Sequence, residues 1–188
     1  VSPAKLRRAL FAVVARHPML CARIVQLDGT AYQKLDRKSL PPWTEVDCDG
    51  HSDEELLRQV QEQARRPFDL LVDSPLRFTL FLRSHGPSLL LSCMHHLNTD
   101  GVSLSIFLRD VEAAYQRISQ GGEPALPPPS GSYADFVSQE SAPAQPDVTA
   151  AEAFFRRVLQ DGVPPLDLPG SRPRRQPALH GDLLSLSL

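Results

Sequence analysis

Residues 88–101 read SLLLSCMHHLNTDG, and this stretch decides the fold. Its first seven residues, 88–94, are largely apolar and have the length of one strand. Two adjacent histidines follow, and Asp100 and Gly101 come four and five residues after the second of them. Over residues 102–118, apolar residues recur at three- and four-residue spacing, which is typical of an amphipathic helix. The stretch therefore predicts a strand, a turn that carries both histidines, and a helix. The apolar side of that helix is expected to hold Val102, Leu104, Ile106, Phe107, Leu108, Val111, Tyr115 and Ile118.

Helices and strands alternate around this stretch. Pro3 has the residue type of a first helical position, and the helix is expected to end near Arg16, just before a proline. Asp28-Gly29 lies between two β-like runs, which predicts a hairpin, and Ser52 begins a capping box. We predict helices over residues 3–16, 53–65, 102–118, 133–139 and 149–159, and strands over 22–26, 31–35, 43–46, 76–82 and 88–94. This interleaving indicates the α/β (α+β) class, with a mixed β-sheet flanked by helices.

Two segments carry more specific expectations. In residues 76–82, Leu76, Phe78, Leu80 and Leu82 alternate with Arg77, Thr79 and Phe81, which predicts a strand buried mainly on one face. Residues 163–177 are rich in proline and arginine, so they are expected to run extended over the surface. Residues 183–188 alternate apolar residues with serine, as a strand does.

Composition and charge exclude several classes of function. Lys and Arg number 20 against 22 Asp and Glu, for a formal charge of −2, whereas binding to nucleic acid or to an anionic membrane surface needs an excess of positive charge. No apolar run is long enough to cross a membrane, and the N-terminal residues lack the pattern of a secretion signal. Cys21, Cys48 and Cys93 are widely spaced, which indicates a reducing, cytoplasmic environment and incidental thiols.

The paired histidines are the candidate for chemistry. Adjacent residues of a strand point to opposite faces, so we expect His95 to face packing or the backbone and His96 to face a cleft, or the reverse. Asp100 is placed either to cap the following helix or to form a buried ion pair with an arginine, and Gly101 allows the chain to reverse. The diverging side chains argue against a metal site at His95, His96 and Asp100.

The His-His-x-x-x-Asp-Gly segment resembles the signature of the chloramphenicol-acetyltransferase-like superfamily, and specifically of condensation domains of nonribosomal peptide synthetases. Three further stretches resemble condensation-domain motifs: RHPML at 16–20, YADF at 133–136 and LDLPGSRPR at 166–174. Their order and spacing also fit, so the resemblance covers essentially the whole chain.

The resemblance implies a fold of two lobes arranged in a V around an active-site tunnel. Residues 1–176 would form the N-terminal lobe without its first strand, and residues 177–188 would begin the crossover strand toward the C-terminal lobe. Because half of the tunnel is then missing, the 188-residue chain is expected to be inactive by itself.

The resemblance also implies roles for single residues. It makes His96 the catalytic residue and Asp100 a structural residue that pairs with an arginine. That arginine directly follows a leucine in the family, but here Leu20 is followed by Cys21. Arg23 or Arg77 would have to replace the missing arginine; otherwise Asp100 acts only as a helix cap. His95, Gly101 and Ser103 complete the motif.

The implied reaction is attack of an acceptor amine on a donor acyl thioester, giving an amide. A neutral imidazole can take up or position the proton that the amine loses, or steer charge in the tetrahedral intermediate. No bound cofactor is implied, because both substrates arrive on the 4'-phosphopantetheine arms of carrier proteins. Two alternatives stay open: an acyltransferase of the same superfamily that uses coenzyme A or a carrier, and a condensation-like module that binds a partner without catalysis.

Overall fold

The structure is a computed structural model, and it describes residues 2–35, 40–140, 146–160 and 162–163. The chain divides into two compact units, one of residues 1–136 and a second that begins at Val137. The boundary predicted at residues 176–177, the strand predicted at 183–188, the proline-rich motif at 166–174 and most of the segment 163–177 lie outside the described residues.

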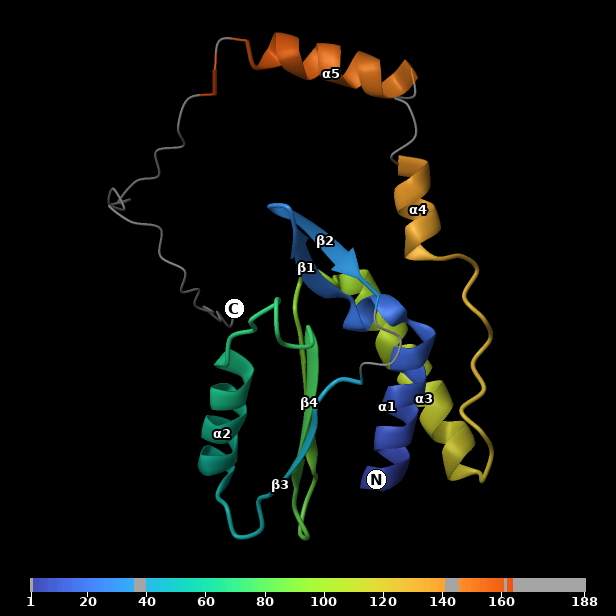
Figure 1. The fold of residues 1–188 in the computed structure, drawn as a ribbon. Coiled ribbons are helices and arrows are strands. Elements are labelled where there is room, and N and C mark those ends of the chain that lie inside the picture. Colours follow the sequence, from blue (N-terminus) through green and yellow to red (C-terminus); the bar gives the residue numbers. More distant parts are fainter. Residues whose placement is uncertain (1, 36–39, 141–145, 161, 164–188) are drawn as a thin grey trace, which may run out of the picture. The chain divides into compact units, whose positions relative to one another are not determined.

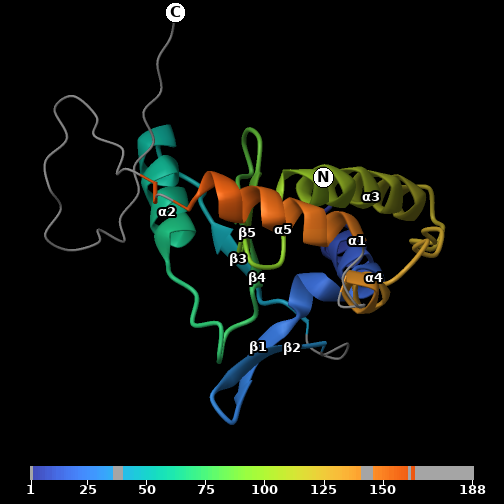
Figure 2. The same cartoon turned by 90° about the horizontal axis from the view of Figure 1, so that it is seen from above.

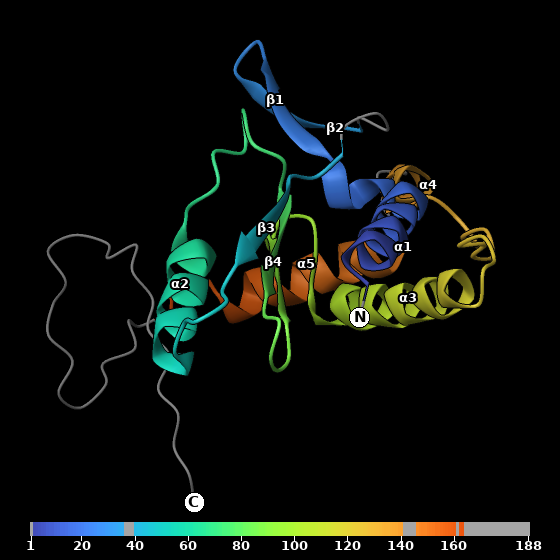
Figure 3. The same cartoon turned by 90° about the horizontal axis from the view of Figure 1, so that it is seen from below.

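The first unit is built in three layers around a sheet of three strands, β3 (Trp43–Asp47), β4 (Leu76–Leu82) and β5 (Leu89–Met94), in the order β3-β4-β5. The β3-β4 pair is parallel and the β4-β5 pair is antiparallel, which confirms the predicted mixed sheet. Helices α1 (Pro3–Arg16) and α3 (Gly101–Ser119) lie on one side of the sheet, and α2 (Asp53–Arg65) lies on the other (Figures 1 and 3).

The central strand β4 is buried on both faces, so the prediction of burial mainly on one face is wrong. Leu76 and Phe78 belong to the core cluster under α1 and α3, whereas Phe81 packs with Cys48 and Leu56 beneath α2. The alternation in the sequence marks one face correctly. It misses the second face because α2, the element that precedes β4 in the chain, packs over it, and the alternation carries no information on that packing.

A two-stranded hairpin lies apart from this sheet, formed by β1 (Arg23–Leu27) and β2 (Thr30–Lys34) (Figure 2). Its turn has positive φ at both central residues, 50° at Asp28 and 80° at Gly29, the backbone that a two-residue hairpin turn requires. The hairpin predicted from Asp28-Gly29 is therefore confirmed. A short 3₁₀ helix, η1 (Pro18–Cys21), connects α1 to β1.

The helices begin where their capping residues predict. Ser52 and Glu55 form a reciprocal capping box at α2, in which the Glu55 backbone N–H donates to Ser52 Oγ at 3.2 Å and the Ser52 N–H donates to Glu55 Oε2 at 2.8 Å. The two short helices predicted toward the C-terminal end are present as α4 (Tyr133–Glu140) and α5 (Pro146–Val158). No helix among the described residues is long and apolar enough to cross a membrane.

Helix α3 buries a narrower face than its sequence predicts. Phe107, Ala114 and Ile118 are buried, but Leu104 and Leu108 are 45% and 57% exposed. Phe107, Ala114 and Ile118 face α1 and the sheet, whereas Val111 and Tyr115, on the flank of that face, are only partly buried.

Candidate active site

The two histidines follow the last residue of β5, in the turn that leads to α3. The turn is held by main-chain hydrogen bonds, since the His95 N–H donates to the Pro75 carbonyl at 2.8 Å and the Asn98 N–H donates to the His95 carbonyl at 3.0 Å. Gly101 is the first residue of α3, directly after the Asp100 cap. This turn places both imidazoles at the edge of the sheet formed by the end of β5.

The two imidazoles lie in different environments. His95 is half-buried, its ring meets Phe68 edge to face at 5.9 Å, and its Nδ1 accepts a hydrogen bond from the Leu97 N–H at 3.1 Å. A ring nitrogen that accepts is not protonated, so the proton of neutral His95 lies on Nε2. His96 is exposed. The divergence expected of adjacent residues is present, since the His95 ring packs against Phe68 and the His96 side chain is exposed.

His96 lines a groove of about 290 Å³. Its lining residues come from three segments far apart in sequence: Met19 from η1, Tyr133 from the start of α4, and the motif residues Leu97, Asn98, Thr99, Asp100 and Ser103. The groove therefore unites three of the four stretches that the sequence singles out, 16–20, 95–101 and 133–136. The fourth, 166–174, is outside the part of the chain that the structure describes.

Asp100 is exposed and caps α3. Its Oδ1 accepts hydrogen bonds from the Ser103 backbone N–H at 2.7 Å and from the Ser103 hydroxyl at 2.6 Å. The bonds from the Ser103 hydroxyl and backbone lower the pKa of Asp100 below its usual range, and the positive charge that His96 can carry acts in the same direction. Asp100 is therefore a carboxylate near neutral pH, next to His96.

Neither candidate arginine pairs with Asp100. Arg23 donates to the Val72 carbonyl at 2.7 Å. Arg77 donates to main-chain carbonyls, including that of Gln63 at 3.2 Å, and its guanidinium lies 4.0 Å from the centre of the Phe68 ring. Both guanidinium groups thus satisfy carbonyls at the end of α2 or in the chain that follows it. The expectation of an Asp100 ion pair with Arg23 or Arg77 is not met, and the cap to α3 is the role that the geometry gives this carboxylate.

Asn98, which sequence reasoning did not single out, joins the histidine turn to η1. Its side-chain Nδ2 donates to the Met19 carbonyl at 2.7 Å and to the Ala22 carbonyl at 2.9 Å. Both partners are carbonyls, so the amide orientation follows from the contacts. The side-chain Oδ1 is buried and has no partner among the described residues. The sequence gives no signal for this role of Asn98, which lies between Leu97 and Thr99. Its hydrogen-bond partners are main-chain carbonyls, and no residue type marks them.

We expect Asn98→Leu to destabilise the domain by about 2 kcal/mol, because it leaves two inward-facing carbonyls without donors. The measurement is urea unfolding of the whole condensation domain. Leu97→Ala, a change at an exposed neighbour in the same turn, is the matched control and is expected to stay within about 0.5 kcal/mol. Equal unfolding midpoints for Asn98→Leu and the unmutated domain would contradict the role given to these bonds.

A buried charge cluster lies where α1 ends against α3. Asp110 has a side chain only 8% exposed, and its Oδ2 lies 2.8 Å from His17 Nε2 and 3.1 Å from Arg16 Nε. Arg109 also contacts its Oδ1, at 3.2 Å. Burial raises the pKa of Asp110, but hydrogen bonds from His17 and Arg109 and the charge of Arg16 outweigh it and lower the pKa overall. The sequence identifies Arg16-His17 as part of a motif, and the structure shows that Asp110 is the partner of both side chains.

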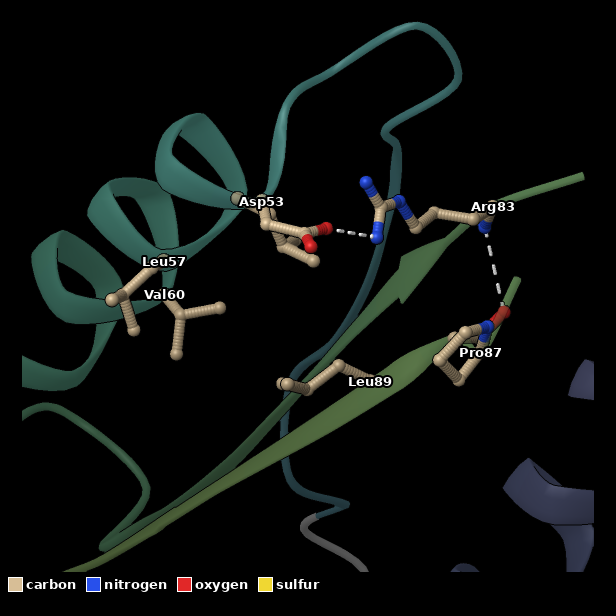
Figure 4. A pocket seen from close by; sticks show the side chains of 8 residues that line it. Asp53, Leu57, Val60, Arg83, Pro87 and Leu89 are labelled. Carbon is tan, nitrogen blue, oxygen red and sulfur yellow. Dashed lines mark hydrogen bonds and ion pairs between the residues drawn. The ribbon is translucent and has the colours of Figure 1, made fainter. Parts of the chain in front are cut away.

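A second pocket, of about 340 Å³, lies between α2 and the start of β5, away from the histidines (Figure 4). Leu57, Val60 and Leu89 form its apolar wall, and an ion pair of 2.7 Å between Arg83 and Asp53 lies at one end. None of the motif residues lines it. Within the described ranges, no group of three or more His, Cys, Asp or Glu residues could hold a metal ion.

Comparisons with known proteins agree with this geometry. The family model "Condensation domain" matches residues 1–188. The chain is 33% identical over 177 residues to a linear gramicidin synthase of Brevibacillus parabrevis, and 34% identical over 168 residues to a surfactin synthase of Bacillus subtilis. These alignments cover 92% and 88% of the chain but only 2% and 4% of the two relatives.

Solved structures show the same fold. The X-domain from teicoplanin biosynthesis matches 85% of this chain and 36% of its own, with 26% identity and a TM-score of 0.72. The epimerization domain from the third module of tyrocidine synthetase B matches 89% of this chain and 38% of its own, with a TM-score of 0.76 at 24% identity, which bears on the fold alone. With three of the four motifs at one groove and the family model spanning the whole sequence, the chain belongs to the condensation-domain family.

Proposed function

We propose that this chain is part of a condensation domain that forms amide bonds in nonribosomal peptide or hybrid polyketide biosynthesis. The donor is an acyl or aminoacyl thioester and the acceptor is an amine, each tethered to a carrier protein. The observation that carries the proposal is the exposed His96 imidazole in a groove that unites three family motifs. The names of the relatives, among them linear gramicidin synthase and polyketide synthase PksN of Bacillus subtilis, support the biosynthetic setting.

In the proposed reaction the acceptor nitrogen attacks the carbonyl carbon of the donor thioester. A C–N bond forms, the C–S bond breaks, and the carrier's thiol leaves. The nitrogen loses one proton, which the neutral His96 imidazole takes up and then passes to the leaving thiolate. The Asp100 carboxylate lines the same groove and caps α3, so it helps fix the turn that carries His96.

The partners in this proposal are carrier proteins, which deliver both substrates on 4'-phosphopantetheine arms, and the C-terminal lobe of the same domain. No protein-bound cofactor is required, because the thioester itself supplies the driving force. A cytoplasmic location, expected from the cysteine usage, is part of the proposal. The tethering also explains why a chain with a net charge of −2 needs no strong electrostatic field to collect its substrates.

The test compares two forms of the same acyl donor with the full-length protein, one loaded on a carrier protein and one on coenzyme A. We expect the carrier-loaded donor to be converted at least about tenfold faster at equal concentration, because tethering raises the effective concentration at the groove. Equal rates, or a preference for coenzyme A, would favour the alternative acyltransferase. Carrier binding with no turnover of either donor would favour a binding module.

A further inference from the structure

We infer that the condensation site has an apolar subsite that receives a hydrophobic side chain or acyl chain of the substrate. The inference rests on the proposed function of His96. The subsite is a pocket of about 160 Å³ between η1 and the first turns of α3. It is lined by His17, Met19, Leu20, Asn98, Ser103, Ile106 and Phe107.

The pocket adjoins the groove of His96. Met19, Asn98 and Ser103 line both, so they form the shared wall. A substrate whose reacting group lies at His96 therefore has its neighbouring atoms close to the pocket. The part of a thioester or amine substrate nearest its reacting group is the side chain on the neighbouring carbon.

The polar lining groups are already committed to the protein. His17 Nε2 lies 2.8 Å from Asp110, Asn98 Nδ2 donates to two carbonyls, and the Ser103 hydroxyl donates to Asp100. Asn98 Oδ1 is buried and has no partner among the described residues. Because the lining is mostly apolar, a polar or charged occupant would lose more hydration there than an apolar one.

The pocket's walls and size define the class of occupant. Met19, Leu20, Ile106 and Phe107 supply the apolar surface. A cavity of about 150 Å³ is large enough for a benzene ring, so a pocket of this size suits a side chain such as that of leucine or phenylalanine. Phe107 is a firm wall, because it is buried and stacks on Phe78 with ring centres 6.2 Å apart.

Ile106 is the residue through which the pocket can be altered without disturbing the core, since it is 36% exposed. It lies three residues after Ser103 on the same face of α3. We expect Ile106→Trp to fill the pocket and Ile106→Ala to enlarge it. Leu108→Trp, on the same helix but outside the pocket and 57% exposed, is the matched control.

The experiment uses the full-length protein and substrate pairs that differ only in side chain, alanyl against leucyl. One arm varies the side chain of the carrier-loaded donor, and the other varies that of the acceptor. In the arm whose varied side chain enters the pocket, Ile106→Trp is expected to lower the leucyl-to-alanyl ratio of kcat/KM by about tenfold or more. Leu108→Trp is expected to leave that ratio unchanged. Ile106→Ala is expected to raise turnover of a phenylalanyl substrate relative to leucyl, which keeps the test informative if the tryptophan variant does not fold.

A binding measurement separates this inference from the proposed function. Non-hydrolysable leucyl and alanyl pantetheine amides are titrated into the protein by calorimetry, where we expect leucyl to bind about tenfold more tightly and Ile106→Trp to abolish the difference. Selective binding without any turnover would contradict the proposed function and leave the subsite standing. The subsite would be overturned if Ile106→Trp left the leucyl-to-alanyl ratios unchanged in both kinetic arms and in the binding measurement. It would also be overturned if Leu108→Trp changed these ratios as much as Ile106→Trp does.

Discussion

His96→Ala is expected to lower the rate of product formation from carrier-loaded substrates by about 10²–10⁴-fold in the full-length protein, the range over which a positioned acid or base contributes to catalysis. His96 lies exposed in the groove, so its removal takes away the proposed proton acceptor without opening a cavity. The measurement is single-turnover product formation, with thermal unfolding as the check that the fold is retained. Stability is expected to change by no more than about 0.5 kcal/mol.

The matched control is His85→Ala, the same substitution at an exposed histidine in the loop between β4 and β5. It is expected to leave turnover unchanged. A second variant, His96→Gln, separates the two roles that an imidazole can have here. Glutamine can form hydrogen bonds but cannot take up the proton, so loss equal to that of the alanine variant indicates proton transfer, and retained activity indicates positioning. Full turnover by His96→Ala would remove His96 from the mechanism.

Asp110→Ala is expected to reduce the free energy of unfolding by about 3 kcal/mol, the scale on which removal of one member of a buried ion pair destabilises a protein. The substitution leaves Arg16, whose side chain is 15% exposed, without its carboxylate, and it breaks the contact to His17. Because this cluster joins the end of α1 to the middle of α3, its loss also loosens the helix that begins next to Asp100. Urea unfolding of the whole domain measures the effect.

Glu112→Ala on the same helix is the control for Asp110, since Glu112 is exposed, and its change is expected to stay within about 0.5 kcal/mol. The pH dependence is a second readout. The pKa of Asp110 is lower in the folded protein than in the unfolded chain, so its contribution is fully present above the unfolded value of about 3.9 and is lost as the pH falls through the folded value. The difference in stability between the unmutated domain and Asp110→Ala should shrink over that acidic range. A constant difference would contradict the pairing.

Much of the fold could be predicted, because the relevant physics is local. Pro3 at the start of α1, the capping box at Ser52 and the turn at Asp28-Gly29 each depend on neighbouring backbone groups, and each is present. The burial of β4 on both faces and the exposure of Leu104 on α3 could not be predicted in this way. Burial depends on which helix packs over a face in the folded chain, and hydropathy periodicity carries no information on that.

The same distinction between local interactions and tertiary packing applies to the candidate site. The amino-acid sequence by itself determined the class of the fold, the family and the residue types available for chemistry: two adjacent histidines in a turn between a strand and a helix, followed by Asp100. Only the tertiary structure decided which histidine faces the groove, that Asp100 caps α3, that Asp110 receives Arg16 and His17, and that Asn98 ties the turn to η1. The contacts of Asp110 and Asn98 join residues more than 70 positions apart, so they arise from packing and not from any local pattern.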